Sequence, residues 1–181
     1  MPSPRDVLDF WFSDRVSAKW WVKDPDFDAE VAARLGELHR QAAAGALDDW
    51  AATAEGALAR VLLLDQVPRN IYRDTPAAFA SDAQARRATE AALDAGHDAA
   101  LPEPSQRLFL YLPLEHSESL ADQERCVALM AALGNAMWHD YAVRHRDIVA
   151  RFGRFPHRNA ILGRESTAEE LAFLEQPGSS F

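Results

Sequence analysis

Three segments of the sequence carry more charged and hydrogen-bonding side chains than the packing of a core requires. They cover residues 65–73, 112–118 and 151–159. The side chains in them that could contact a ligand are Asp65, Arg69, Asn70, Arg73, Glu115, His116, Glu118, Arg154, His157, Arg158 and Asn159. Arginine and asparagine present N–H donors that suit carboxylate and phosphate groups, so this pattern indicates a binding site for a small anion.

The third segment lies in a basic stretch of an otherwise acidic chain. Between Arg144 and Arg164 there are six arginines and one acid before Glu165, whereas the whole sequence has a net charge of −9. A cluster of guanidinium groups can hold an anion, but arginines also pair with acids of the same protein and tie loops to the fold. The acids available for such pairing are Asp65, Asp82, Glu115 and Glu118.

Glu115, His116 and Glu118 combine carboxylates with an imidazole, which together can move protons near neutral pH. Neighbours at i and i+1 do not share a face of a helix, and Pro113 places these residues at a helix junction. Acids are favoured at the start of a helix by its dipole alone. Helix capping and a ligand or proton-transfer role therefore both remain open for these residues.

The sequence contains no signature of a metal or cofactor site. It has no His-Glu-x-x-His motif, no glycine-rich phosphate loop and no nucleophile elbow around Ser117. Its one cysteine, Cys126, lies in an apolar run and is interpreted as a buried, inert thiol. We therefore expect no metal and no cofactor, and the acidic charge argues against nucleic acid as a partner.

Composition predicts one intracellular, soluble domain over residues 1–181. The apolar content of 48% is enough for a continuous core, and no linker or low-complexity tract divides the chain. A single cysteine leaves no disulfide framework. The N-terminus lacks the pattern of a signal peptide, and no apolar run has the length of a membrane span. The expected location is the cytoplasm.

Apolar residues recur at helical spacing through almost the whole chain, which predicts an all-α fold of about eight helices. Ser3 and Pro4 are typical of a helix start, and the first helix should reach about Phe12. A second helix is expected from an Asp26 cap to about Gly45, and a third from about 53 to 66, ended by Pro68.

Further helices are expected after Thr75, after Ser81 up to Gly96, and from Pro102 or Pro104 until Pro113 breaks the helix. A long helical stretch should follow a cap at Ser117 or Ser119, with an interruption near Gly134, and continue to Gly153. Residues 153–165 are interpreted as an ordered loop. Ser166 and Glu169 then form a predicted capping box for the last helix. Short connections favour a compact array of helical hairpins.

The sequence resembles the mainly bacterial family called domain of unknown function 924 (DUF924). The strings that carry the resemblance are Val7–Phe12, Leu64–Gln66 with Pro68–Asn70, Ala78–Ala80 with Asp82, Tyr111–Pro113 with Glu115–Glu118, and Arg151–Arg164. Asp74 stands where glycine is more usual in this family. The resemblance implies a tetratricopeptide-like superhelix or bundle, and it implies no activity for any residue.

Two functions are compatible with these observations. The first is the binding or conversion of a small anionic ligand in a pocket lined by the arginine, asparagine, histidine and glutamate side chains of the three segments. The second is a helical adaptor that binds a peptide or protein partner in its groove. The sequence does not decide between them, and it leaves the reaction, the ligand and the oligomeric state undefined.

Overall fold

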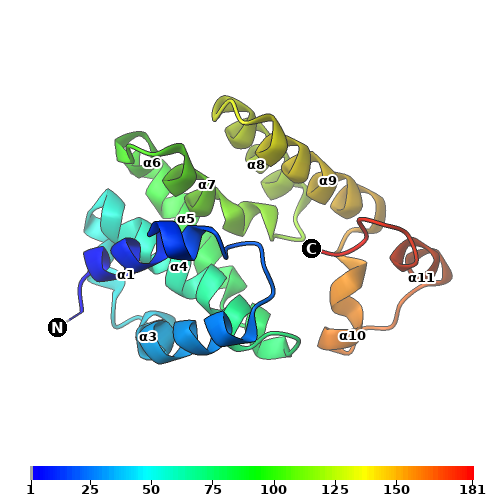
Figure 1. The fold of residues 1–181 in the computed structure, drawn as a ribbon. Helices are drawn as coiled ribbons and strands as arrows, with labels where there is room; N and C mark the ends of the chain where they lie inside the picture. Colours follow the sequence, from blue (N-terminus) through cyan, green and yellow to red (C-terminus); the bar gives the residue numbers. More distant parts are fainter. Residues whose placement is uncertain (1) are drawn as a thin grey trace. The chain divides into compact units, whose positions relative to one another are not determined.

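Residues 2–181, which the computed structural model describes, form eleven α-helices, three short 3-10 helices and no strand (Figure 1). The first part contains α1 (Pro4–Trp11), α2 (Asp14–Ser17), α3 (Pro25–Ala43), η1 (Asp48–Ala52), α4 (Ala54–Ile71), η2 (Pro76–Phe79), α5 (Asp82–Asp94) and α6 (His97–Ala100). The rest contains α7 (Pro104–Glu115), α8 (Leu120–Ala132), α9 (Ala136–Phe152), η3 (Pro156–Arg158), α10 (Asn159–Leu162) and α11 (Ala168–Leu174).

The predicted all-α class is confirmed, whereas the predicted number of about eight helices is too low. The α-helices α2, α6 and α10 have four residues each, which is too short for a helical period to show in the sequence. For the same reason residues 153–165, predicted as a loop, contain η3 and α10. The tetratricopeptide-like arrangement of hairpins stays a prediction.

Several helix ends follow the predicted chemistry, with shifts of one or two residues. The hydroxyl of Ser3 caps α1 in a capping box with Asp6. Helix α3 is capped by the carboxylate of Asp24 rather than by Asp26. The capping box of α11 uses Thr167 and Glu170, one residue after the predicted pair, because the Thr167 hydroxyl and the Glu170 carboxylate each accept the other's backbone N–H.

Both prolines that were expected to end helices lie inside them, so these two predictions are wrong. Helix α4 continues past Pro68 to Ile71, and α7 continues past Pro113 to Glu115. A proline in a helix leaves the carbonyl four residues earlier without its usual donor. For Pro68 this carbonyl belongs to Leu64, and it accepts a hydrogen bond from the Ser81 hydroxyl at 2.6 Å.

The chain divides into two compact units. The first unit comprises the residues up to Arg73 together with Ala77–Pro113, and the second comprises Asp74–Pro76 and Leu114–Phe181. Asp74, at the boundary, has a φ of 61°, in the region that glycine favours. The prediction of one domain over residues 1–181 stays a prediction.

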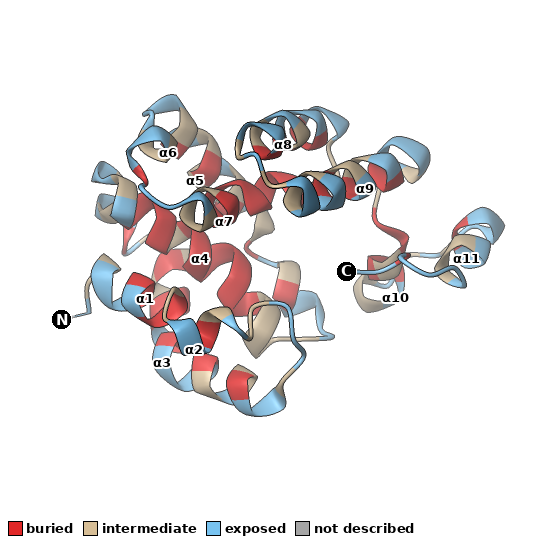
Figure 2. Ribbon diagram, turned by 45° about the horizontal axis from the view of Figure 1, so that its top comes forward, coloured by how far each residue is buried: buried red, intermediate tan, exposed pale blue. Residues whose placement is uncertain are grey.

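Helix α4 is the centre of the first unit and lies beside α1, α3 and α5 (Figure 1). Of the residues from Gly56 to Pro68, all but Arg60 are buried, and the middle of this helix is red in Figure 2. The ring of Trp11 packs edge-on against Phe109, with ring centroids 5.7 Å apart, and at 6.4 Å from Phe27. This apolar core holds the first predicted segment, residues 65–73, at the end of α4.

In the second unit α8 and α9 lie side by side (Figure 1) and meet at Gly134, where the predicted interruption is confirmed. Gly134 takes a φ of 72°, and the Asn135 side chain caps α9. The buried residues Ile148, Val149 and Phe155 pack with Phe152 and Phe173. This cluster positions the third segment, residues 151–159, beside α9.

Candidate functional site

The predicted site residues of the first unit are held in ion pairs and hydrogen bonds. Arg69 donates to both carboxylate oxygens of Asp82, at 2.7 and 3.0 Å, and lies 3.3 Å from the carboxylate of Asp65. Asn70 and Arg73 both donate to Asp28, each at 2.8 Å. Burial raises the pKa of Asp28, but the hydrogen bonds from Arg73 and Asn70 outweigh it and lower the pKa overall. These donors therefore connect α3, α4 and α5.

In the second unit Glu118 holds the loop that follows α9. Its carboxylate accepts two hydrogen bonds from Arg164, at 2.8 and 2.9 Å, and one from the backbone N–H of Phe155 at 2.9 Å. Burial raises the pKa of Glu118, but these hydrogen bonds and the charges of Arg164 and Arg158 lower it overall. Glu118 is thus ionised and positions Phe155 and the residues after it.

Arg154 and Asn159 converge on one buried carboxylate, that of Glu170. Arg154 donates to both of its oxygens at 2.7 and 2.8 Å, and Asn159 donates at 3.2 Å. The Glu170 residue is only 2% exposed, and the hydrogen bonds from Arg154 lead the causes that lower its pKa to about 2. The carbonyl oxygen of the Asn159 side chain accepts from Arg164 at 2.9 Å. These contacts link the two carboxylates, Glu118 and Glu170, through Arg164 and Asn159.

The remaining predicted residues of this unit lie around a group of imidazoles. Arg158 is buried, donates to the backbone carbonyl of His116 at 2.9 Å and covers the ring of Phe155 at 4.6 Å from its centroid. His157, the residue before Arg158 in η3, has its ring 5.7 Å from the Phe155 ring. The Nδ1 atom of His157 is buried and has no hydrogen-bond partner among the described residues. A polar atom in this state is costly unless a ligand or water contacts it.

His145, on α9, extends this group but was not predicted as a site residue. Its Nδ1 lies 2.8 Å from the backbone carbonyl of Tyr141 and 3.5 Å from the buried carboxylate of Glu115. The thiol of Cys126 also points at Glu115, at 3.9 Å, and burial raises its pKa well above the ordinary value. Cys126 is therefore a protonated, buried thiol, as the sequence predicted, and not a nucleophile.

Burial and the charge of Arg158 keep His145 and His157 neutral. Burial is the largest cause that lowers the pKa of His145 to about 3 and of His157 to about 4. The charge of Arg158 lowers both values further, and only Glu118 acts in the opposite direction on His157. Both imidazoles are consequently neutral at pH 7. The guanidinium of Arg158, which acts on His157, favours the approach of an anion.

These low pKa values predict a loss of stability in acid. An unfolded histidine has a pKa near 6.5, so between pH 6.5 and 4 the unfolded chain binds more protons than the folded one. The free energy of unfolding therefore decreases as the pH is lowered. Each histidine should cost up to about 2 kcal/mol between pH 7 and 5. We expect His157→Phe to reduce the difference between the urea unfolding free energies at these two pH values by about that amount. An unchanged difference would contradict the buried, neutral state of His157.

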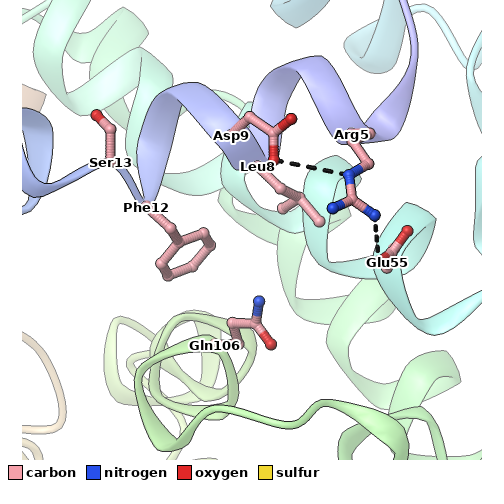
Figure 3. A pocket seen from close by; sticks show the side chains of 7 residues that line it. All are labelled: Arg5, Leu8, Asp9, Phe12, Ser13, Glu55 and Gln106. Carbon is pink, nitrogen blue, oxygen red and sulfur yellow. Dashed lines mark ion pairs between the residues drawn. The ribbon is translucent and has the colours of Figure 1, made fainter.

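A cavity of about 400 Å³ lies elsewhere, in the first unit (Figure 3). Its lining consists of Arg5, Leu8, Asp9, Phe12, Ser13, Glu55 and Gln106. Arg5 lies between the carboxylates of Asp9 and Glu55, at 3.7 and 3.9 Å, and its side chain is 72% exposed. Charges exposed to this degree are screened by water and bind little. This cavity could not be predicted from the sequence, because its lining comes from three separate segments and contains no recognisable motif.

Residues 2–181 contain neither a candidate metal site nor a helix that could span a membrane. Among residues 2–181, no three histidine, cysteine, aspartate or glutamate side chains are grouped so that they could hold a metal ion. Within the same residues, no helix combines the length and the apolar character needed to cross a bilayer.

Comparison with known proteins places this geometry in a family. Residues 7–178 match the model of a family described as bacterial protein of unknown function (DUF924). The solved structure of a protein of unknown function from Agrobacterium tumefaciens is similar, with a TM-score of 0.90 and 45% identity over 95% of this chain and 96% of that one. No curated protein matches the sequence. The chain belongs to the DUF924 family.

Proposed function

We propose that the second unit binds a small anionic ligand at a site formed by His116, His157 and Arg158. The observation that carries this proposal is the buried Nδ1 of His157, which lacks a hydrogen-bond partner among residues 2–181 and lies beside a guanidinium. A neutral imidazole can present an N–H to an oxyanion without the cost of burying a further charge. Arginine supplies the charge that such a ligand needs.

The surrounding ion pairs support the proposal because they fix the frame of the site. The Glu118–Arg164 pair connects residues 153–165 to the segment before α8, and the Glu170–Arg154 pair connects them to α11. Side chains already held in this way keep η3 in place, so the donors of His157 and Arg158 do not have to be ordered when a ligand binds. A preorganised site loses less entropy on binding and can hold a small ligand.

The charge balance favours an anion over a cation. The charges of Arg158 and Arg164 act on His157, against that of Glu118, which Arg164 already neutralises. The first-unit cavity, in contrast, is lined by two carboxylates and one guanidinium on exposed side chains. Of the two places, the buried group in the second unit has the stronger and less screened field.

Calorimetric titration with inorganic phosphate and with succinate tests this proposal. We expect binding by the native protein and a loss of affinity of about 10-fold or more in His157→Phe and in Arg158→Gln, because each removes one hydrogen bond to a charged group. Arg144→Gln is the matched control, since Arg144 is exposed and its partners are the carboxylate of Asp140 and the exposed ring of Tyr141. Equal affinity in all four proteins, or no binding of either anion, would refute the proposal.

Thermal melting of each variant separates a loss of binding from a loss of folding. A variant that melts like the native protein but no longer responds to phosphate supports a direct contact, because a ligand stabilises only the state that binds it. If Arg158→Gln does not fold, His157→Phe alone decides the question. If the native protein binds neither anion but binds a peptide, this result would instead favour the adaptor function.

A further inference from the structure

We infer that the anion-binding site takes ligands that carry an aromatic ring, and that the side chain of Phe181 occupies the position of that ring. This inference rests on the proposed function and names the class of ligand. The Phe181 ring stacks on the imidazole of His145, with ring centroids 3.8 Å apart and an interplanar angle of 25°. It is a stacked aromatic contact directly beside the histidines of the site.

The surface under Phe181 is suited to an aromatic ring. His145 is buried and its ring is oriented by the contact of Nδ1 with the Tyr141 carbonyl. Its low pKa keeps it neutral, so a ring can cover its face without removing water from a charge. Two more rings border the same place. The centroid of the Phe155 ring lies 5.6 Å from that of His145, and the centroid of the Tyr141 ring lies 6.5 Å from that of Phe181. Two aromatic side chains, Phe155 and Tyr141, thus border the place where Phe181 covers the His145 ring.

Phe181 itself is held loosely enough to be replaced. It follows the end of α11 at Leu174 and the turn at Gly178, and it is 47% exposed. Burial of only half a phenyl ring stabilises much less than complete burial. A ligand ring that takes its place keeps the stacking on His145 and allows the Phe181 ring to enter water.

The position of His157 defines where the charged group of such a ligand belongs. The rings of Phe181 and His157 are perpendicular, with an interplanar angle of 74° and centroids 6.1 Å apart. This separation suits a charged group attached directly to the ring, as in an aryl phosphate or an aromatic carboxylate. The ring would stack on His145 while its oxygens face the Nδ1 of His157 and the guanidinium of Arg158.

The test compares phenyl phosphate with methyl phosphate, which has the same charged group and no ring. In Phe181→Ala we expect phenyl phosphate to bind about 10-fold more tightly than in the native protein, with the affinity for methyl phosphate unchanged. Phe181→Leu should give a smaller gain, because leucine still covers part of the imidazole. Leu171→Ala, which removes another exposed apolar side chain of this unit, should change neither affinity.

Each outcome of this titration is informative. If Phe181→Ala changes the affinity for both phosphates equally or for neither, the aromatic position is refuted while anion binding stands. If neither compound binds to any variant, the proposed function itself fails and this inference fails with it. In the double variant Phe181→Ala with His145→Leu, the gain for phenyl phosphate should disappear, and a gain that persists would locate the ring elsewhere.

Discussion

Replacement of Gly56 by alanine is expected to destabilise the protein by about 3 kcal/mol. A Cβ atom at this position would overlap the backbone carbonyl oxygen of Trp50 and lie 2.8 Å from its carbonyl carbon. Backbone atoms cannot turn away as a flexible side chain can, so η1 or α4 must shift. Urea unfolding monitored by the fluorescence of the tryptophans, one of which is Trp50, measures the effect.

Gly36→Ala is the matched control for this prediction. Gly36 also lies inside a helix, α3, but no atom lies within 4 Å of the place that its Cβ would occupy. Alanine restricts the unfolded chain more than glycine does and favours helix, so this variant should be more stable than the native protein by about 0.5–1 kcal/mol. Equal effects of the two substitutions would contradict the close approach of α4 to η1.

Glu170→Ala should produce the second large effect, a loss of roughly 3 kcal/mol at pH 7. The substitution removes the acceptor for Arg154 and Asn159 and for the backbone N–H of Thr167. Breaking a buried ion pair by removing one partner usually costs 3 kcal/mol or more, and the value is at the low end here because Arg154 can turn toward water. Chemical unfolding of the full chain provides the measurement.

The neighbouring residue provides the control. Glu169→Ala removes a carboxylate from the same turn of α11, but Glu169 is exposed and pairs with Arg151 on the surface. Exposed pairs contribute less than about 1 kcal/mol, so this variant should be close to the native protein. The role of Glu170 would be disproved if the two variants were equally stable. It would also be disproved if Glu170→Ala lost as little stability at pH 7 as at pH 2, where about half of the Glu170 carboxyl groups are protonated.

The class of fold could be predicted from the sequence because helical periodicity is a local property. Ser3, Gly134 and Gly153 mark helix ends through their own backbone preferences, and the structure places ends at all three. Pro68 made the prediction wrong because the cost of a proline in a helix is local, whereas its compensation here is distant. The Ser81 hydroxyl that binds the freed Leu64 carbonyl is 17 positions away along the chain, and no sequence rule connects the two.

The residue types of the candidate site can be read from the sequence, but their pairing cannot. Residues 151–159 contain three arginines and one histidine, and in the structure His157 and Arg158 lie in one group with Glu118. Which arginines pair with acids depends on tertiary structure. Arg154 pairs with Glu170 of α11, a helix whose first turn was predicted only to form a capping box. His145 looked like an ordinary residue of a helix because its neighbour Phe181 is 36 positions away.

The burial of α4 on all sides has a consequence for synthesis of the protein. One neighbouring helix cannot cover all the apolar side chains of a helix that is buried on every side. Helix α4 packs against α1 and α3, which precede it in the chain, and against α5, which follows it. On the ribosome, a nascent chain that has not yet released residues 82–94 exposes apolar side chains such as Leu62 and Leu63 to water. During that interval the growing chain is open to aggregation and is a natural client for chaperones.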